Sequence, residues 1–203
     1  MFVYKFGSQI MIILVYVDDI VLTGNVPSLL STFIATLSRA FEIRDFGPLH
    51  YFLGIDVSSL RSGLHLSQTK YTLELLICSN MLDCKPCSTP LRAKSQLSVS
   101  DGTLLPDASE YRHLVGSLQY LTLTRPDIAY VVHIVSQFMS APRTDHYTAV
   151  KRILRYLKGS LDFGLVFRPS AGALSLHAFS DADWASCPDS RRSTTGFCVF
   201  LGS

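Results

Sequence analysis

The stretch MIILVYVDDIVLTG, Met11 to Gly24, decides how the rest of the sequence is interpreted. It is almost wholly apolar, except for two adjacent carboxylates in its middle, Asp18 and Asp19. Burying an unpaired carboxylate is so unfavourable that the group usually takes up a proton instead. Two acids in this position therefore need either an exit from the apolar layer or a cation that neutralises them.

The residues on either side of the acids have the composition of β-strands. MIILVY predicts a buried strand because it is rich in Ile, Val and aromatic residues, and IVLTG predicts a second short strand that ends at Gly24. Residues 17–19 make a tight connection between the strands, so the stretch predicts a hairpin with acids at its tip. Such a tip lets the carboxylates emerge from the sheet while the strands stay buried.

A carboxylate pair at a hairpin tip suits a hard divalent cation. Mg²⁺ takes oxygen ligands and uses phosphate oxygens to complete its shell. Two such ions about 3.5–4 Å apart clamp the attacking and leaving oxygens in phosphoryl transfer. The alternative is a plain Asp-rich turn, but the eight apolar residues before the acids and the three after them favour the metal site.

Composition sets the class of protein. The 203 residues, 48% hydrophobic and 17% charged, exclude general disorder and suffice for one large or two small domains. The formal net charge of +2 argues neither for nor against a nucleic-acid partner. The apolar run before Asp18 is much shorter than the roughly 20 residues of a spanning helix, so we expect no membrane partner.

The cysteines indicate a compartment but no metal site. There are five, Cys78, Cys84, Cys87, Cys187 and Cys198, and the N-terminus is a poor signal peptide, which predicts free thiols in a reducing intracellular compartment and no secretion. CKPC, residues 84–87, has CxxC spacing, but no second ligand pair for zinc is evident. The six histidines form no HxxxH pattern, so we assign them no ligand role.

The rest of the chain alternates between helical and strand patterns. NVPSLLSTFIATLSRAF predicts an amphipathic helix packed on the hairpin, with Asn25 or Ser28 as its N-cap. Strands that turn at RSG, residues 61–63, and a helix over TKYTLELLICSNM follow. A linker and a long helical region broken at Arg125-Pro126 come next. The chain ends in strands over LDFGLVFRPSAGALSLHAFSDADWA and TTGFCVFLGS, which are expected to start a second sheet.

Several ordered motifs carry a family resemblance. YVDD, residues 16–19, looks like the polymerase motif of reverse transcriptases. FGPLHYFLGIDV, LSQTKY, MLDCKPCSTPL, YRHLVGSLQYLTLTRPDIAYVV, AVKRILRYLKGS and SDADWASCPDSRRSTTGFCVFLG follow in the order found in polyproteins of copia-type retrotransposons, particularly those of plants. The resemblance covers essentially the whole chain.

The resemblance implies an α+β fold in four segments. Residues 1–90 would be the rear half of a reverse-transcriptase palm and the start of a thumb, and residues 91–108 a linker. Residues 109–170 would be a helical thumb and connection. Residues 171–203 would hold the first hairpin of a ribonuclease H-like sheet.

The resemblance also assigns roles around a polymerase site that uses Mg²⁺ or Mn²⁺. Asp18 matches the catalytic metal ligand, and Asp19 matches its partner, a weaker or indirect ligand. Tyr16 matches the residue near the primer terminus and the incoming nucleotide. FLG, which is Phe52, Leu53 and Gly54, matches the hairpin that grips the primer strand.

Two further groups concern the second half of the chain. Asp181 matches the first catalytic, metal-binding carboxylate of ribonuclease H, whereas Asp183 matches a neighbouring position. Lys151, Arg155 and Lys158 are spaced along one helical stripe, which predicts a row of positive charges that contacts the phosphates of an RNA–DNA duplex. An ordinary solvated helix face is an equally open alternative.

The acids that are missing bear on activity. Residues 1–17 contain no Asp or Glu, and only Asp183 and Asp189 follow Asp181. A two-metal polymerase site needs another carboxylate from an earlier palm strand, so we expect a partial reverse transcriptase with truncated ribonuclease H that is inactive alone. It would need the missing palm and fingers segment to act on an RNA template. The alternative is a non-catalytic nucleic-acid-binding or structural remnant.

Overall fold

The computed structural model describes residues 1–92, 96–169 and 175–202. The chain forms two compact units, Met1–Leu53 and Gly54–Ser203. Part of the predicted linker, residues 93–95, and the predicted boundary at residues 170 and 171 lie outside the described residues. The division into four segments with palm, thumb and ribonuclease H roles therefore stays a prediction.

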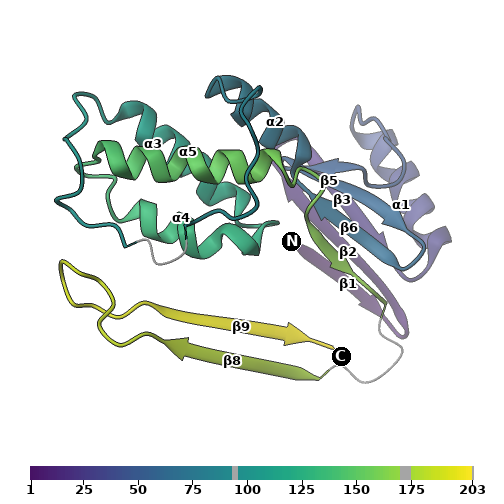
Figure 1. Ribbon diagram of the computed structural model, residues 1–203. Helices are drawn as coiled ribbons and strands as arrows, with labels where there is room; N and C mark the ends of the chain where they lie inside the picture. Colours follow the sequence, from purple (N-terminus) through teal and green to yellow (C-terminus); the bar gives the residue numbers. More distant parts are fainter. Residues whose placement is uncertain (93–95, 170–174, 203) are drawn as a thin grey trace. The chain divides into compact units, whose positions relative to one another are not determined.

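The first unit is built around the predicted hairpin. Strands β1 (Phe2–Phe6), β2 (Gln9–Tyr16) and β3 (Asp19–Gly24) form an antiparallel sheet in that order, and helix α1 (Pro27–Ala40) follows (Figure 1). The two-residue strand β4 (Tyr51–Phe52) ends the unit. Gly24 ends β3 as predicted. The backbone of β2 lies so close to Gly24 that a Cβ added there would be 2.6 Å from the Ile10 carbonyl oxygen. The hairpin is confirmed, and β1 extends its sheet by one strand.

The prediction that MIILVY is buried is wrong. Among residues 1–53, all of which the structure describes, Met11 is the one buried hydrophobic side chain, whereas Val15 and Tyr16 are 45% and 53% exposed. A sheet has two faces, and a strand is buried only where other elements cover them. Helix α1 contacts β3 without burying any residue of its own, so it does not cover the sheet enough to bury MIILVY. The strand composition was therefore a guide to β-structure but not to depth.

The predicted N-caps of α1 are also wrong. Val26 occupies the N-cap position without a side-chain hydrogen bond, and Pro27 begins the helix. The Asn25 side chain instead accepts a hydrogen bond from Ile10 N–H at 2.8 Å and donates one to the Ser8 carbonyl at 2.7 Å. Asn25 thus ties the end of β3 to the start of β2, which takes its amide away from the helix.

The second unit contains two short sheets and a group of helices. Its elements are β5 (Ile55–Leu60), β6 (Gly63–Ser67), α2 (Thr69–Cys78), α3 (Ser109–Leu121), the 3-10 helix η1 (Pro126–Ile128), α4 (Ala129–Ser136), α5 (Thr144–Lys158), β7 (Leu165–Phe167), β8 (Leu176–Ala182) and β9 (Thr195–Leu201). The predicted hairpin at residues 61–63, the helix α2 and the break near Arg125-Pro126 are confirmed.

Strand β7 corrects one further prediction. LDFGLVF was expected to open the second sheet, but Leu165–Phe167 pairs antiparallel with β6, with Leu66 opposite Leu165. The approach requires Gly164, where an added Cβ would lie 2.1 Å from the Leu66 carbonyl oxygen. Within the described part of the chain, the last sheet consists of the hairpin β8–β9, and every residue of both strands is exposed.

Helices α2, α3, α4 and α5 enclose the main hydrophobic core, and Figure 1 shows α5 alongside α3 and α4. The α5 residues at helical spacing, Val150, Ile153, Leu154 and Leu157, are fully buried, as their periodicity predicts. Each such side chain contributes about 1.5–3 kcal/mol relative to an exposed one. Burial in the described chain is therefore concentrated in this helical group.

A buried guanidinium joins the ends of these helices. Arg125, 2% exposed, donates from Nε and Nη2 to the Asp127 carboxylate at 2.9 and 2.7 Å. It also donates to the carbonyl and hydroxyl oxygens of Ser160, at 2.9 and 2.8 Å, just beyond α5. Tyr156 O–H adds a 2.7 Å hydrogen bond to Asp127. The break between α3 and α4 is thus bound to the C-terminal end of α5.

The Asp127 carboxylate is stabilised in its charged form. Partial burial favours the neutral form, but the hydrogen bonds from Arg125 and Tyr156 outweigh burial and lower the pKa of Asp127 below its ordinary value. A lowered folded-state pKa means that the stabilisation is fully present above about pH 4 and is lost as the pH falls through the folded-state pKa.

We predict that Asp127→Asn lowers the free energy of unfolding by about 2 kcal/mol at pH 7, because it leaves the buried Arg125 charge without its partner. Urea denaturation at pH 7 and pH 2 measures the effect, and the gap between variant and wild type should shrink at pH 2. Asp162→Asn, at an exposed carboxylate, is the control and should change stability by less than about 0.5 kcal/mol. Equal losses in both variants, or a gap that persists at pH 2, would contradict the role of this ion pair.

Candidate functional site

The hairpin tip is a two-residue loop. Tyr16 ends β2 and pairs with Asp19, which begins β3, so Val17 and Asp18 alone connect the strands. Val17 has a φ of +53°, in the left-handed region that β-branched residues rarely adopt, whereas Asp18 does not have a positive φ. This turn presents Asp18 at the extreme tip and Asp19 at the first strand position, and both side chains are exposed.

The two carboxylates fit a hard divalent cation in their chemistry but not in their number. Carboxylate oxygens are the ligands that Mg²⁺ and Mn²⁺ prefer. Across the described residues, no group of three or more His, Cys, Asp or Glu side chains is arranged to hold a metal ion. Asp18 and Asp19 can therefore supply part of a coordination shell, with other ligands completing it.

The FLG residues form a second tight turn. Phe52 ends β4, and Leu53 and Gly54 have consecutive positive φ values of +47° and +74°, as in a type I′ turn. An added Cβ at Gly54 would also lie 2.7 Å from the Tyr120 hydroxyl, so that side chain would have to shift. Phe52 and Leu53 belong to the unit that holds Asp18, whereas Gly54 begins the other unit.

Asp181 lies near the end of β8. It is exposed and stands opposite Gly196 of β9. The neighbouring Asp183 has a local structural role, because it accepts hydrogen bonds from the Ser186 hydroxyl and Thr194 N–H, and these lower the pKa of Asp183. Asp183 thus closes the turn region between the two strands, and Asp181 is the carboxylate left accessible beside it.

The three cations of the predicted α5 stripe differ in their surroundings. The Lys151 ammonium lies 4.5 Å from the centre of the Tyr147 ring, and Tyr147 in turn donates a 2.6 Å hydrogen bond to Glu110. Burial and Glu110 together raise the pKa of Tyr147 to about 12. Arg155 Nε donates to the Lys85 carbonyl at 2.7 Å, and Lys158 is half-buried. The stripe is therefore not a uniformly solvated face.

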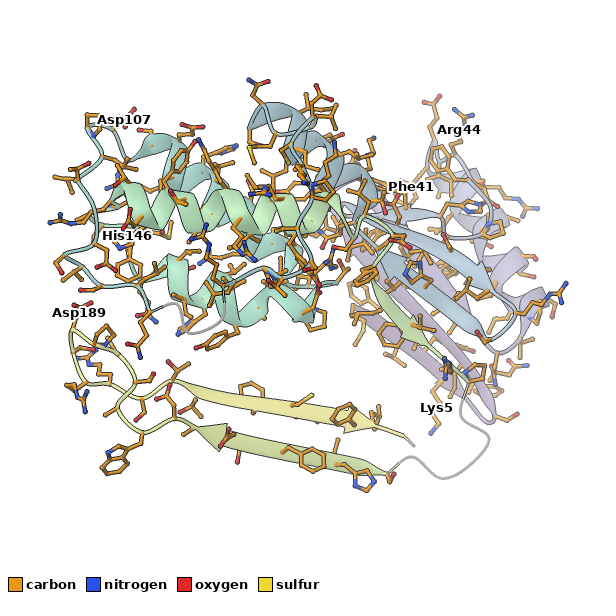
Figure 2. All side chains as sticks on the ribbon, viewed as in Figure 1. Lys5, Phe41, Arg44, Asp107, His146 and Asp189 are labelled. Carbon is orange, nitrogen blue, oxygen red and sulfur yellow. The ribbon has the colours of Figure 1, made fainter. Side chains whose placement is uncertain are left out.

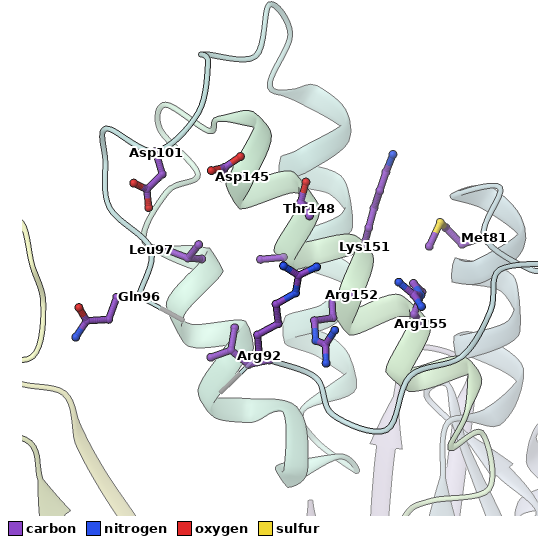
Figure 3. Close-up of a pocket in the computed structure, with 12 residues that line it drawn as sticks. Met81, Arg92, Gln96, Leu97, Asp101, Asp145, Thr148, Lys151, Arg152 and Arg155 are labelled. Carbon is purple, nitrogen blue, oxygen red and sulfur yellow. The ribbon is translucent and has the colours of Figure 1, made fainter. Parts of the chain in front are cut away.

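A pocket of about 500 Å³ lies beside α5 and was missed by sequence reasoning (Figure 3). Its cationic side chains are Lys151, Arg152 and Arg155 from α5 and Arg92 from the segment between α2 and α3. Arg152 falls outside the stripe at helical spacing, and Arg92 is far upstream in the chain. Two basic residues so distant in sequence share no local pattern, so only the fold reveals that they line one pocket.

A fully buried histidine lies near the start of α5. His146, at the start of α5 (Figure 2), is fully buried, stacks on Phe138, and bonds through its two ring nitrogens to Arg143 N–H and the Ser98 carbonyl. It is a packed residue.

Within residues 1–92, 96–169 and 175–202, no helix is both long and apolar enough to traverse a bilayer.

The strained tip gives a testable prediction. A β-branched residue with positive φ costs of order 1–3 kcal/mol, so Val17→Gly should leave the free energy of unfolding unchanged or raise it. Val15→Gly, at an exposed position of the adjacent strand, is the matched control and should lower it by about 1 kcal/mol. Chemical denaturation monitored by circular dichroism compares the two. Equal destabilisation by both variants would show that the turn is not strained at Val17.

Comparisons with known proteins place the chain in a family. A family model described as reverse transcriptase (RNA-dependent DNA polymerase) matches residues 1–93. The chain is 50% identical over 202 residues to the Retrovirus-related Pol polyprotein from transposon RE2 of Arabidopsis thaliana, covering 100% of this chain and 14% of that protein. It is 38% identical to the corresponding polyprotein from transposon TNT 1-94 of Nicotiana tabacum, covering 94% of this chain and 15% of that protein.

A shorter relative matches over most of its own length. An uncharacterized mitochondrial protein of Arabidopsis thaliana is 53% identical over 192 residues, which cover 95% of this chain and 79% of that protein. No solved structure matches the chain. The chain spans 14% of the length of the RE2 polyprotein, so it corresponds to a small part of such a polyprotein. The YVDD hairpin is present, and the chain is 50% identical to the RE2 polyprotein over 202 residues. The chain therefore belongs to the copia-type retrotransposon reverse transcriptases of plants.

Proposed function

We propose that β2–β3 is the polymerase hairpin of an RNA-directed DNA polymerase and that this chain contributes Asp18 and Asp19 to its divalent-metal site. The observation that carries the proposal is the two-residue turn, which exposes both carboxylates of the YVDD sequence at the end of an antiparallel hairpin. Neither carboxylate forms an ion pair with any described residue, so both remain available to a ligand.

Each residue of the hairpin has a distinct role in this proposal. Asp18, at the tip, is the direct ligand of Mg²⁺ or Mn²⁺, and Asp19 supports it. The metal, when bound, neutralises charge that develops on the transferred phosphoryl group. Tyr16 is 53% exposed beside Asp19 and offers its ring to the primer terminus or the incoming nucleotide. Phe52, Leu53 and Gly54 form the turn that holds the primer strand.

The described residues alone do not complete this site. Two carboxylates from one turn leave most of a metal's coordination shell to other ligands. We therefore propose that a further carboxylate, together with the segment that holds nucleotide and RNA template, comes from outside the described residues. The same reasoning applies to Asp181 on β8, which we propose as one carboxylate of a ribonuclease H site that other segments must complete.

Primer extension on an RNA template tests the polymerase proposal. The chain alone should extend no primer above background, and addition of the palm and fingers segment of a related polyprotein should restore extension. Asp18→Asn should then abolish the restored activity, because an amide oxygen is a far weaker ligand for Mg²⁺.

Asp162→Asn is the matched control, since it removes an exposed carboxylate that belongs to the other unit. It should leave the restored activity intact. Extension by the chain alone, or full activity of Asp18→Asn in the complemented reaction, would overturn the proposal.

A second function rests on the cations of α5. Lys151, Arg155 and Lys158 form no ion pair with a carboxylate among the described residues, within 4.0 Å. We propose that these three cations bind the phosphates of an RNA–DNA duplex, which proteins recognise mainly through backbone charge and shape. This binding requires no complete catalytic site, so it also suits a non-catalytic nucleic-acid-binding protein.

Salt dependence measures that contribution. Affinity for an RNA–DNA duplex should fall steeply with salt, and the variant with Lys151, Arg155 and Lys158 all changed to Ala should have a slope of log K against log[salt] that is smaller by about one unit per lost contact. Arg168→Ala removes an exposed cation from another part of the unit and serves as control. An unchanged slope in the triple variant would mean that the stripe is a solvated helix face.

A further inference from the structure

The pocket beside α5 has the size and the lining of a small-molecule site. Its volume of about 500 Å³ lies within the roughly 300–1,000 Å³ range of ligand pockets and greatly exceeds the space that a single phosphate needs. Apolar side chains of Met81, Leu91, Leu97 and Ala149 share the lining with charged groups. An occupant therefore needs an apolar surface as well as charge.

The cationic side of the pocket is fixed and lacks a counter-charge. Arg152 Nη2 donates to Thr89 Oγ1 at 2.7 Å, which holds the guanidinium in place, yet its buried Nε has no hydrogen-bond partner among the described residues. Arg155 is held by the Lys85 carbonyl. No described carboxylate lies within 4.0 Å of Arg92, Arg152 or Arg155. A buried donor without a partner is costly, so this arrangement favours an anion that accepts from the arginines.

The opposite side of the pocket is acidic. Figure 3 shows Asp101 and Asp145 at the end away from Arg152 and Arg155. Asp101 accepts a hydrogen bond from Ser98 N–H at 2.7 Å through one carboxylate oxygen, which fixes the group at the rim of the pocket. Carboxylates repel a ligand that is anionic throughout, but they accept hydrogen bonds from hydroxyl and amino groups.

We propose that this pocket binds a phosphorylated nucleoside. Its phosphate lies against Arg92, Arg152 and Arg155, its ring packs on the apolar lining, and its hydroxyl or exocyclic amino groups donate to Asp101 and Asp145. The same chemistry is offered by a free mononucleotide and by one nucleotide unit of a single strand. The site uses no residue of the polymerase hairpin, and Arg92 and Arg152 lie outside the proposed duplex stripe.

Titration of the full chain with adenosine monophosphate, adenosine, inorganic phosphate and single-stranded oligoadenylate tests the proposal. Amide chemical shifts of the lining residues report the position of binding. The monophosphate or the oligonucleotide should shift them, and adenosine or inorganic phosphate should bind at least about tenfold more weakly, because each lacks one half of the recognised groups. Binding of the monophosphate identifies the free nucleotide as the source, and binding of the oligonucleotide alone identifies the strand.

Two variants and a control locate the phosphate. Arg92→Ala, at an exposed residue, and Arg152→Ala should each weaken binding by about tenfold, whereas Arg168→Ala should not. Equal affinity for adenosine and its monophosphate, inorganic phosphate binding as tightly as the monophosphate, or equal weakening by Arg168→Ala would overturn the proposal.

Discussion

The buried guanidinium of Arg125 is the interaction on which the second unit depends. It binds Asp127 beside it and both oxygens of Ser160, so one side chain joins the junction of α3 and α4 to the end of α5. A buried cation is tolerated only with such complete partners. Helix α5 is thereby held with one face in the core and with Lys151, Arg152 and Arg155 lining the pocket, and every proposal about phosphate recognition depends on that orientation.

The YVDD hairpin is set by different physics. Within residues 1–53 its sheet buries a single hydrophobic side chain, so the tip geometry comes from strand register and the turn rather than from a core. This is sufficient to expose two carboxylates but not to surround a metal ion with ligands. The second unit differs in burial, because its helices enclose a packed hydrophobic core and a basic pocket lies beside α5. The proposed metal site at the hairpin therefore calls for further ligands, whereas residues of the second unit alone form the proposed binding pocket beside α5.

Local patterns in the sequence predicted local structure. The hairpin around Asp18, the buried stripe of α5 that includes Leu154, and the break at Arg125-Pro126 all follow from residue periodicity and turn chemistry, and all are present. The pairing of β7 with β6 did not follow, because it joins segments far apart and depends on the absence of a side chain at Gly164. The pocket between Arg92 and Arg152 was missed for the same reason. Composition also failed to predict the depth of MIILVY, because burial depends on how many layers cover a sheet.

Amide hydrogen exchange of the full chain tests most directly whether the helical group anchored by Arg125 is the stable centre of the molecule. The amides of α5 from Val150 to Leu157 should exchange most slowly, at rates that report global unfolding, and those of the fully exposed β8–β9 hairpin should exchange much faster. Exchange in α5 as fast as in β9 would contradict the central place given to this helix.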